Sequence, residues 1–570
     1  MKFTPAIEKI TLKQLDSLEV DHLARELSVP SPIASILCSR GLKSAEACHH
    51  FFNPVLGQMH DPFIFGEMRK AVDRIQKALY NKEKIAVYGD YDVDGVTSTA
   101  MMVRLLRKFG ADCMYYLPNR LIDGYGFSKT GIEQIAAEGA KLIISVDCGI
   151  NACDEISLAN SLGIDVVVTD HHEPKEVSPD AVARINPKMP GCAYPDKNLA
   201  GVGVALKLCQ ALVRSSSLSD DLWVEYLDLA ALGTAADIVP LTGENRIITK
   251  FGFEQLSKSK NLGLRTLIKQ RGLEGEAIST SQAVFALAPC INAAGRLGDP
   301  RRGVELMLTE DRPQARLYAK KLIETNSERQ SLDSRVEAEA VAWVQESCDP
   351  ENDFGIVAGN ERWHCGVIGI VASKIVEKFH RPTILFSIGE DGLARGSGRS
   401  ISGFHLMEAL TRCGGFLEGF GGHKAAAGMV IKKENIGKFR QAFNEEVKKM
   451  LAGRDLVPVV NADAEIYLSD INPNFMEHIK KMEPYGPGNM RPVLYCRNLT
   501  NRYAPRIVGR GHLKMLVSDG RAAMDAIGFN FGDRLDAVTN AGAFSLAFTL
   551  DENFWNGRKN LQMKLKGVTT

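Results

Sequence analysis

Short apolar runs alternate with helical segments between Lys84 and Asp170, and this alternation constrains the fold more than any other feature of the sequence. The apolar runs are rich in β-branched residues and are typical of strands that are buried on both faces. Strands of this kind, separated by helices, indicate a parallel sheet with helices on both sides. The predicted strands are 85–89, 113–117, 141–147 and 164–170, and the predicted helices are 96–109, 128–138 and 154–162.

Acidic and histidine side chains follow three of these strands at the point where each strand ends. They are Asp90, Asp92 and Asp94 after the first strand, Asp147 after the third, and Asp170, His171 and His172 after the fourth. Ligands of such sheets bind at the carboxyl ends of the strands, so we expect these side chains to lie together. Carboxylates with a histidine suit Mn²⁺ or Mg²⁺, and the histidine favours Mn²⁺. The number of carboxylates indicates two ions with a shared ligand, an arrangement used to attack phosphate esters.

The aspartate triplet taken by itself has two other interpretations. The pattern D-x-D-x-D-G also opens the calcium loop of an EF-hand, but that loop needs a glutamate at its twelfth position and a helix in front. Here the twelfth position is Met101, and a strand-like run precedes the triplet. The triplet could also be a solvated acidic turn. The two later strand ends favour the metal site.

Composition places few limits on function. Lys and Arg together number 69, as do Asp and Glu, so a nucleic-acid surface has to be a local patch. The 12 cysteines include no C-x-x-C pair, which argues against a structural zinc site and a disulfide scaffold. No apolar run approaches the length of a membrane span, and the N-terminal residues have no signal-like apolar region. We expect a cytoplasmic protein with no membrane contact and, at 570 residues, several domains.

Four segments resemble the motifs of the DHH phosphoesterase superfamily: DYDVDG, SVDCG, TDHH and GTAADIVP. Over essentially its whole length, the chain is similar to the RecJ family of this superfamily, which are 5′→3′ exonucleases specific for single-stranded DNA. The resemblance implies an α/β fold with a parallel-sheet DHH domain, a long connecting helix, an α/β DHHA1 domain and a C-terminal OB-type β-barrel. The expected segments are an N-terminal helical lead-in (1–80), the DHH catalytic domain (81–275), a phosphate-clamp loop with the long helix (276–349), the DHHA1 substrate-binding domain (350–452) and the OB-type nucleic-acid-binding domain (453–570).

The resemblance also implies roles for the residues at the strand ends and for two residues further along the chain. It implies two Mn²⁺ or Mg²⁺ ions. One would be held by Asp90 and Asp92, and the other by Asp94, His171 and Asp237. Asp147 would bridge the two ions. Near the scissile phosphate, His172 would act as donor or proton source, and Arg296 would hold a non-bridging oxygen.

Further substrate contacts are expected in two regions. The segment from Asn292 to Arg296, which we interpret as a loop, resembles a family motif that clamps phosphate, although Cys290 stands where the family pattern suggests arginine. Three glycine-containing stretches between 350 and 450 also suggest phosphate binding, because glycine lets backbone amides approach an anion, although each could be a plain turn. The residues concerned are Trp363, His364, Ser397, Arg399, Gly422 and His423.

The C-terminal part combines β-rich patterning with local positive charge. Residues 491–521 contain six arginines and one lysine against a single aspartate, Asp519, with tyrosines nearby. This combination fits a groove that tracks the phosphates of a single strand and stacks its bases, although an ordinary basic barrel face has the same composition. Before it, residues 312–346 predict one long amphipathic helix.

The function we expect is metal-dependent hydrolysis of single-stranded DNA from the 5′ end, in DNA repair and recombination. One alternative is a DHH phosphodiesterase of short oligoribonucleotides or cyclic dinucleotides, and the long helix and basic C-terminus speak against it. Another is a non-catalytic replication scaffold, and such relatives lose metal ligands that are all in place here. The resemblance implies a single-strand-binding protein and a helicase as partners, and a monomer is the simplest expectation.

Overall fold

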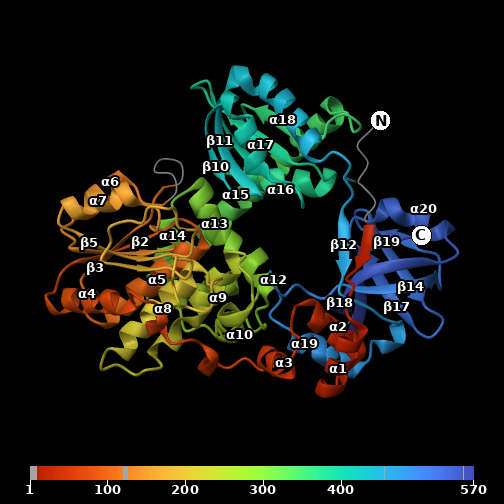
Figure 1. The fold of residues 1–570 in the computed structure, drawn as a ribbon, viewed down its shortest axis with the longest axis horizontal. Helices are drawn as coiled ribbons and strands as arrows, with labels where there is room; N and C mark the ends of the chain where they lie inside the picture. Colours follow the sequence, from red (N-terminus) through yellow and green to blue (C-terminus); the bar gives the residue numbers. More distant parts are fainter. Residues whose placement is uncertain (1–8, 120–125, 455, 556–557) are drawn as a thin grey trace. The chain divides into compact units, whose positions relative to one another are not determined.

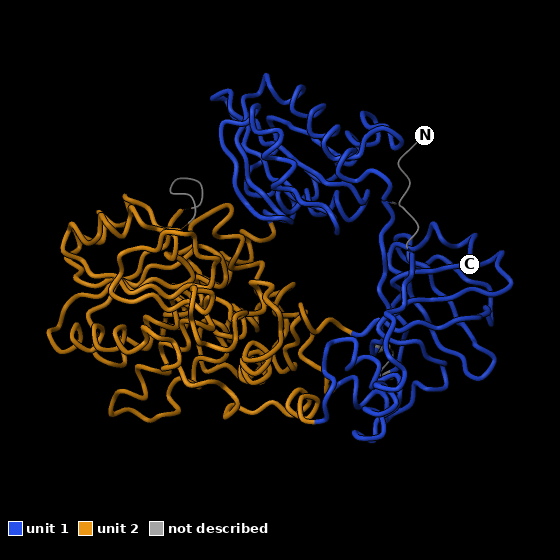
Figure 2. The backbone as a smooth tube through the Cα atoms, viewed as in Figure 1, with its two compact units in different colours: residues 1–45, 328–480, 492–570 blue, residues 46–327, 481–491 orange. Residues whose placement is uncertain are grey.

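The computed structural model describes residues 9–119, 126–454, 456–555 and 558–570, so the first eight residues of the expected lead-in lie outside the described part. The chain forms two compact units, which Figure 2 distinguishes by colour. Unit 2 contains Glu46–Ser327 together with Lys481–Arg491. Unit 1 contains the described residues up to Ala45, Glu328–Lys480 and Pro492–Thr570. The division into five segments stays a prediction.

Unit 2 is built on a parallel five-stranded sheet, as the alternating pattern predicts (Figure 1). The spatial order is β3-β2-β4-β5-β6, and every neighbouring pair is parallel. The strands are β2 (Ile85–Gly89), β3 (Cys113–Tyr116), β4 (Leu142–Val146), β5 (Asp165–Thr169) and β6 (Ala183–Ile185). The sequence did not predict β6, because three residues are too few to show a periodic pattern.

The central strands bury side chains on both faces because consecutive residues of a strand point to opposite sides. In β2, Ile85 and Val87 join one apolar core, and Ala86 and Tyr88 join another. Helices α4 (Met68–Tyr80), α5 (Val93–Lys108) and α8 (Gly201–Arg214) contribute to the first core. Helices α6 (Lys129–Ala137) and α7 (Cys153–Ser161) contribute to the second (Figure 1).

The other helices of unit 2 complete the layer that contains α5 and α8. They are α9 (Leu227–Ala236), α10 (Gly243–Leu256), α11 (Leu262–Gln270), α12 (Thr280–Gln282), the π-helical turn η4 (Ala283–Leu287), α13 (Ala288–Leu297) and α14 (Arg301–Leu308). Helix α3 (Ala45–Phe52) begins at the last residue of the first part of unit 1 and continues in unit 2. The predicted long helix is confirmed as α15 (Arg312–Ser347), which begins in unit 2 and ends in unit 1. The prediction of a loop from Asn292 to Arg296 is wrong, since this segment lies in α13. Its alanines favour helix, and Pro289 suits the first turn.

The first part of unit 1 is a second α/β structure with a mixed sheet. Its strands are β7 (Ile356–Asn360), β8 (Thr383–Ile388), β9 (Leu393–Arg399), β10 (Leu417–Gly422) and β11 (Ala426–Lys432), in the order β10-β11-β9-β8-β7. Only β7 and β8 are parallel. Its helices are α16 (Ile368–Phe379), α17 (Leu406–Arg412) and α18 (Ile436–Met450).

The C-terminal part of unit 1 contains a closed barrel. Strand β14 pairs with β18 on one side and with β16 on the other, so that β14, β18, β19, β17 and β16 form a ring. These five strands are β14 (Leu494–Asn501), β16 (His512–Ser518), β17 (Ala523–Gly528), β18 (Phe544–Trp555) and β19 (Arg558–Thr569). Around them lie β13 (Ala464–Glu465), β15 (Arg506–Val508), α19 (Pro473–Lys481) and α20 (Leu535–Asn540). The expected OB-type barrel is confirmed.

The N-terminal lead-in is helical only in part. It contains α1 (Ser17–Leu27) and α2 (Ser31–Ser39), but the strand β1 (Lys9–Leu12) precedes them. Strand β1 pairs in parallel with β12 (Val459–Ala462), a partner that no local pattern could reveal. Within the described residues, none of the helices is both long enough and apolar enough to cross a membrane.

A buried ion pair fastens α8 to α10 in unit 2. The Lys207 Nζ lies 2.6 Å from the Glu244 Oε1, and the two side chains are 0% and 1% exposed. The Glu244 carboxylate also accepts hydrogen bonds from the His60 amide at 2.9 Å and the Tyr194 hydroxyl at 2.5 Å. Because a buried charge needs an opposite charge and hydrogen-bond partners, these contacts fix how the helices meet.

We expect Lys207→Met to destabilise the packing of α8 on α10 by about 3–5 kcal/mol, because Glu244 would keep an uncompensated buried charge. The double variant Lys207→Met/Glu244→Gln should lose less than the sum of the two single variants. Hydrogen exchange at the amides of α8 and α10 measures this cost as local opening. As a control, Glu254→Gln removes the exposed pair with Lys250 and should change stability by less than about 1 kcal/mol. Strict additivity of the two core variants would contradict the coupling.

Candidate metal centre

The aspartate triplet occupies the turn between β2 and α5. Asp92 is the N-cap of α5, and its Oδ1 accepts a hydrogen bond from the Gly95 amide at 3.1 Å. A side chain at Gly95 would clash with the main chain, since its Cβ would lie 2.4 Å from the Asp90 carbonyl oxygen. The helix therefore starts at Val93, earlier than predicted. Of the three aspartates, Asp90 thus lies in the loop after β2, Asp92 is the N-cap, and Asp94 lies in the first turn of α5.

Helix α8 holds Asp94 through its first turn. The Gly201 amide donates to the Asp94 Oδ2 at 2.7 Å, and the Val202 amide donates to the Asp94 Oδ1 at 2.7 Å. The positive end of the α8 dipole favours a carboxylate at this position. Each carboxylate oxygen has a second lone pair, which is available to a cation.

Asp147 follows β4 in an unusual backbone conformation. Its φ is +61°, in the left-handed region, and its side chain is buried. Such a conformation costs about 1–3 kcal/mol and is concentrated at functional sites. Gly201 makes room for this carboxylate, because a Cβ there would lie 2.3 Å from the Asp147 Oδ1.

The three residues after β5 differ in function although they are adjacent in sequence. The Asp170 carboxylate accepts from the Ile150 amide at 2.9 Å and lies 2.7 Å from the His172 Nδ1. Asp170 therefore orients His172, a contribution that our sequence analysis missed. In contrast, the His171 Nε2 lies 3.3 Å from the Asp147 Oδ1 and 3.6 Å from the Asp237 Oδ2.

The structure brings all six predicted metal ligands together, at the carboxyl edge of the sheet and the end of α9. Possible ligand atoms lie within 4.8 Å of one another in three groups: Asp90, Asp92 and Asp147; Asp94, His171 and Asp237; and Asp147, His171 and His172. The first two groups contain the residues that the resemblance divides between two ions. The assignment of each residue to an ion stays a prediction.

Among the described residues, the Asp147 Oδ1, the His171 Nε2 and the Asp237 Oδ2 are buried here without a hydrogen bond. A buried polar atom without a partner costs about 1–3 kcal/mol. All three are ligand atoms that divalent cations accept, so the residues fit such ions. Burial, and secondly His172, lowers the pKa of His171 to about 3, which keeps its imidazole in the neutral form that binds metal.

The carboxylates also need positive charge. Burial and then the charge of Asp92 raise the pKa of Asp94 to about 7. Burial, followed by Asp94 and Asp92, raises the pKa of Asp237 to about 9, and similar causes raise that of Asp147 well above its usual value. Burial alone would lower the pKa of His172, but Asp170 and the neighbouring carboxylates raise it above the ordinary value, which favours the imidazolium.

Helix α13 packs against the aspartate turn. The Asn292 Oδ1 accepts a hydrogen bond from the Val93 amide at 3.1 Å, and a Cβ at Gly295 would lie 2.7 Å from the Tyr91 carbonyl oxygen. The helix thereby carries Arg296, whose charge counteracts the burial that raises the pKa of Asp92. Cys290, at the position where we expected arginine, is fully buried and offers no surface contact.

The substrate-binding residues expected in unit 1 lie in three different settings. The Trp363 ring is 3% exposed and belongs to an apolar core, with its indole N–H donating to Glu339 at 3.0 Å. The His364 Nδ1 accepts from the Gly366 amide at 3.0 Å. Ser397 and Arg399 are joined at 3.0 Å on β9 and lie against Gly369 in the first turn of α16. Gly422 and His423 are exposed at the end of the β10–β11 hairpin.

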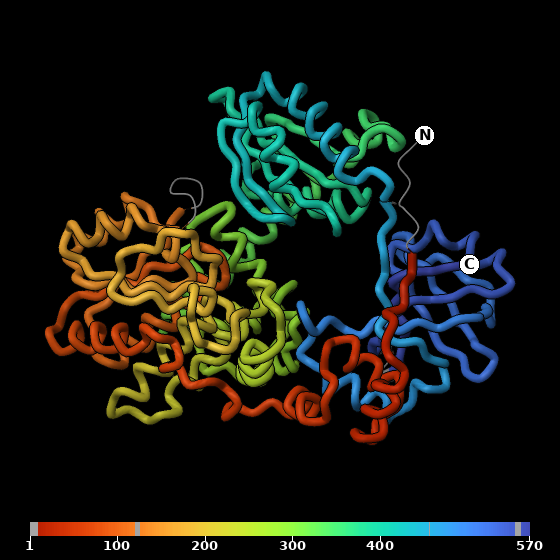
Figure 3. Tube along the Cα trace, in the orientation of Figure 1, coloured from red at the N-terminus to blue at the C-terminus, as the bar shows by residue number. Residues whose placement is uncertain are grey.

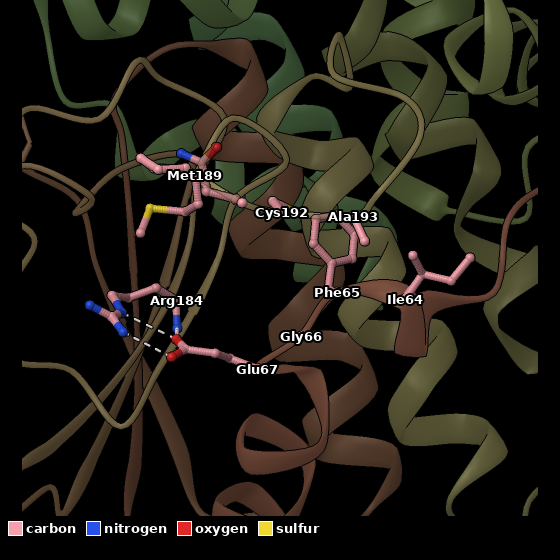
Figure 4. Close-up of a pocket in the computed structure, with 11 residues that line it drawn as sticks. Ile64, Phe65, Gly66, Glu67, Arg184, Met189, Cys192 and Ala193 are labelled. Carbon is pink, nitrogen blue, oxygen red and sulfur yellow. Dashed lines mark hydrogen bonds and ion pairs between the residues drawn. The ribbon is translucent and has the colours of Figure 1, made fainter.

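A cavity of about 280 Å³ lies between the segment Ile64–Glu67 and residues 184–193 (Figure 4). Its wall includes the ion pair between Arg184 and Glu67, at 2.8 Å, together with mostly apolar side chains. Asn186 also lines it, and the Asn186 Nδ2 donates to the His172 carbonyl oxygen at 2.9 Å. This wall therefore supports the backbone of His172.

Three family models match the chain: the DHH family, N-terminal domain, at residues 84–234; the DHHA1 domain at 352–449; and the RecJ OB domain at 462–567. A single-stranded-DNA-specific exonuclease RecJ from Bacillus subtilis (strain 168) is 38% identical over 97% of this chain and 70% of the relative. The Escherichia coli (strain K12) protein of the same name is 36% identical over 98% of this chain and 99% of the relative.

Solved structures agree with these matches. The crystal structure of RecJ in complex with Mn²⁺ from Thermus thermophilus has a TM-score of 0.84 and 28% identity, covering 99% of this chain and 79% of that one. The complex with Mg²⁺ from the same organism has a TM-score of 0.77 and 27% identity, covering 99% and 78%.

In protein stripped of metal with EDTA, we expect the thermal unfolding midpoint to fall as the pH rises from about 5 to 9. The folded protein retains protons on Asp94 and Asp237, with pKa values of about 7 and 9, after the unfolded chain has lost them. Raising the pH therefore favours unfolding. Added Mn²⁺ should remove most of this slope.

The variant Asp147→Asn tests the cause of this slope by calorimetry. It removes one of the repelling carboxylates, so the metal-free slope should become shallower while stabilisation by Mn²⁺ is reduced. Asp154→Asn, at an exposed position in α7, is the matched control and should behave as the unmodified protein. A metal-free midpoint that rises with pH would contradict the electrostatic account.

Proposed function

The chain belongs to the RecJ family of single-stranded-DNA-specific exonucleases, and from this premise we propose that it hydrolyses single-stranded DNA from the 5′ end with two Mn²⁺ or Mg²⁺ ions. One observation carries the proposal: buried carboxylates and the neutral His171 converge on one place, and three of their ligand atoms have no hydrogen bond among the described residues. Divalent cations would bind these atoms and offset the charge of the carboxylates.

The ligand sets expected from the sequence remain our assignment. Asp90 and Asp92 would hold one ion, Asp94, His171 and Asp237 would hold the other, and Asp147 would be shared. Bound there, the ions supply an activated water and polarise the phosphodiester.

The other residues bind and orient the substrate. His172, whose pKa Asp170 raises, donates to the scissile phosphate or to the departing oxygen. Arg296 holds a non-bridging oxygen through its fork of N–H donors, and Asn292 keeps the aspartate turn in place. In unit 1, Ser397 and Arg399 offer donors at the first turn of α16, where an anion is favoured.

Membership of the family also supports proposals beyond the metal centre. We propose that the protein acts in DNA repair and recombination, that its partners are a single-strand-binding protein and a helicase, that it is a monomer and that it is located in the cytoplasm. The basic residues at 491–521 on and near the barrel support a nucleic-acid surface. A phosphodiesterase of short oligonucleotides would have no use for such a surface.

Digestion of single strands labelled at either end tests the activity and its direction. With Mn²⁺ or Mg²⁺, a 5′-labelled strand should lose its label as mononucleotide from the start, whereas a 3′-labelled strand should shorten progressively. EDTA should stop both reactions, because the water would no longer be activated. Initial release of a 3′ label, or cleavage that survives EDTA, would refute the proposal. A preference for dinucleotides would favour the short-substrate alternative.

Replacing the proposed bridging ligand tests the centre. Asp147→Ala should reduce the cleavage rate by more than about 100-fold, since loss of even a supporting partner of a ligand costs 10–100-fold. Asp154→Ala is the control within the same unit and should cleave at the normal rate. Single-turnover cleavage in saturating Mn²⁺ is the measurement, and normal activity of Asp147→Ala would remove this residue from the centre.

A further inference from the structure

A segment from late in the chain completes unit 2. Residues Lys481–Arg491 pack with Glu46–Ser327, although the chain before and after them belongs to unit 1 (Figure 2). Their colour in Figure 3 marks them as part of the last fifth of the sequence. We call Lys481–Arg491 the inserted segment.

Arg246 on α10 holds the start of the inserted segment. Its guanidinium is 3% exposed and stacks over the Phe51 ring at 4.0 Å. It donates at 2.9–3.4 Å to five carbonyl oxygens, which are those of Phe51, Lys481, Met482, Glu483 and Pro484. A buried guanidinium is tolerated only when its donors are used in this way, so the segment and α10 depend on each other.

The inserted segment also has internal hydrogen bonds that fix its shape. The Asn489 side chain, which is 1% exposed, donates to the Met482 and Pro484 carbonyl oxygens at 2.8 Å each. The amides and carbonyls of Gly486 and Asn489 bond to each other at 2.9 and 3.0 Å. The loop is therefore held closed by its own residues as well as by Arg246.

The closed loop contacts the turn that follows Asp237. The Leu241 amide donates to the Pro487 carbonyl oxygen at 2.7 Å. Gly486 lies so close that a Cβ there would be 2.5 Å from the Leu241 Cδ1. On the other side, the Asn245 side chain donates to the Pro240 carbonyl oxygen at 3.0 Å. The turn is thus held from two sides.

This turn needs to be held because Ile238 is strained. Its φ is +63°, in the left-handed region, where a β-branched residue is a clear outlier. The cost is about 1–3 kcal/mol and persists only when the surroundings enforce it. Ile238 directly follows Asp237, so relaxation of its backbone would rotate the Asp237 carboxylate away from His171.

We propose that the inserted segment is a positioning element of the metal centre, which keeps the Asp237 carboxylate beside Asp94 and His171. The inference rests on the proposed function, because it assigns the segment to the second metal ion. The group formed by Asp90, Asp92 and Asp147 contains no residue of this turn. The segment should therefore affect one ion and spare the other.

Mn²⁺ titration of the whole protein without DNA tests the proposal, with calorimetry and electron paramagnetic resonance as readouts. Gly486→Ala pushes the segment away from Leu241, and Asn489→Ala loosens the loop without adding a clash. Either variant should bind one Mn²⁺ with unchanged affinity and the second about 10-fold or more weakly, the size seen when a ligand loses its support. Gly57→Ala is the control, since a Cβ there meets nothing within 4 Å.

The outcomes separate this inference from the proposed function. Two ions bound by both variants with unchanged affinity, or equal weakening of both ions, would overturn the positioning role alone. An unmodified protein that binds no Mn²⁺ would overturn the proposed function and this inference with it. A second ion that is weakened selectively, with a normal circular dichroism spectrum, supports the inference, and high Mn²⁺ should then restore cleavage.

Discussion

Repulsion among buried carboxylates is the constraint that the catalytic unit is built around. Five aspartates lie close together at the sheet edge, and the main chain supplies much of the compensation that brings them there. The first two amides of α8 bind Asp94, and the capped start of α5 binds Asp92. Glycines at 95 and 201 occupy the positions where a side chain would collide with this arrangement. Backbone amides thus share the compensation with the cations, and the charges of Arg296 and His172 add to it.

The adjacent residues His171 and His172 have different protonation properties because their surroundings differ. His171 faces two carboxylates but is buried deeply enough to stay neutral, which suits a ligand. His172 shares a short contact with Asp170, which raises the pKa of its imidazole and favours the protonated form. The sequence D-H-H therefore places an orienting acid, a neutral imidazole that suits a cation and an imidazole that favours its protonated form in three consecutive positions. Asn186 and the cavity wall behind it fix the chain at the same point.

Sequence patterns predicted the features that depend on residues close together in the chain, such as the strands of the parallel sheet and the residues at their ends. Strand ends of a parallel sheet meet at one edge, and this rule alone placed Asp90, Asp147 and His171 together. Asp237 came only from the family resemblance, since it ends a helix and no strand points to it. The pairing of β1 with β12 and the contact of Arg246 with residues 481–484 escaped notice because they join positions hundreds of residues apart. The misread Asn292 segment shows that small residues can signal close helix packing as well as a loop.

The position of the inserted segment in the sequence also determines when unit 2 can complete its folding during translation. Translation delivers Glu46–Ser327 long before it delivers Lys481–Arg491. Domains fold as they emerge from the ribosome, so the sheet and its helices can assemble early. However, the guanidinium of Arg246 and the amide of Leu241 have no partner from this segment, and remain hydrated, until the segment has been synthesised. A nascent chain therefore carries a catalytic unit without its last segment while residues 328–480 are synthesised, and the last step of folding of this unit follows late in translation.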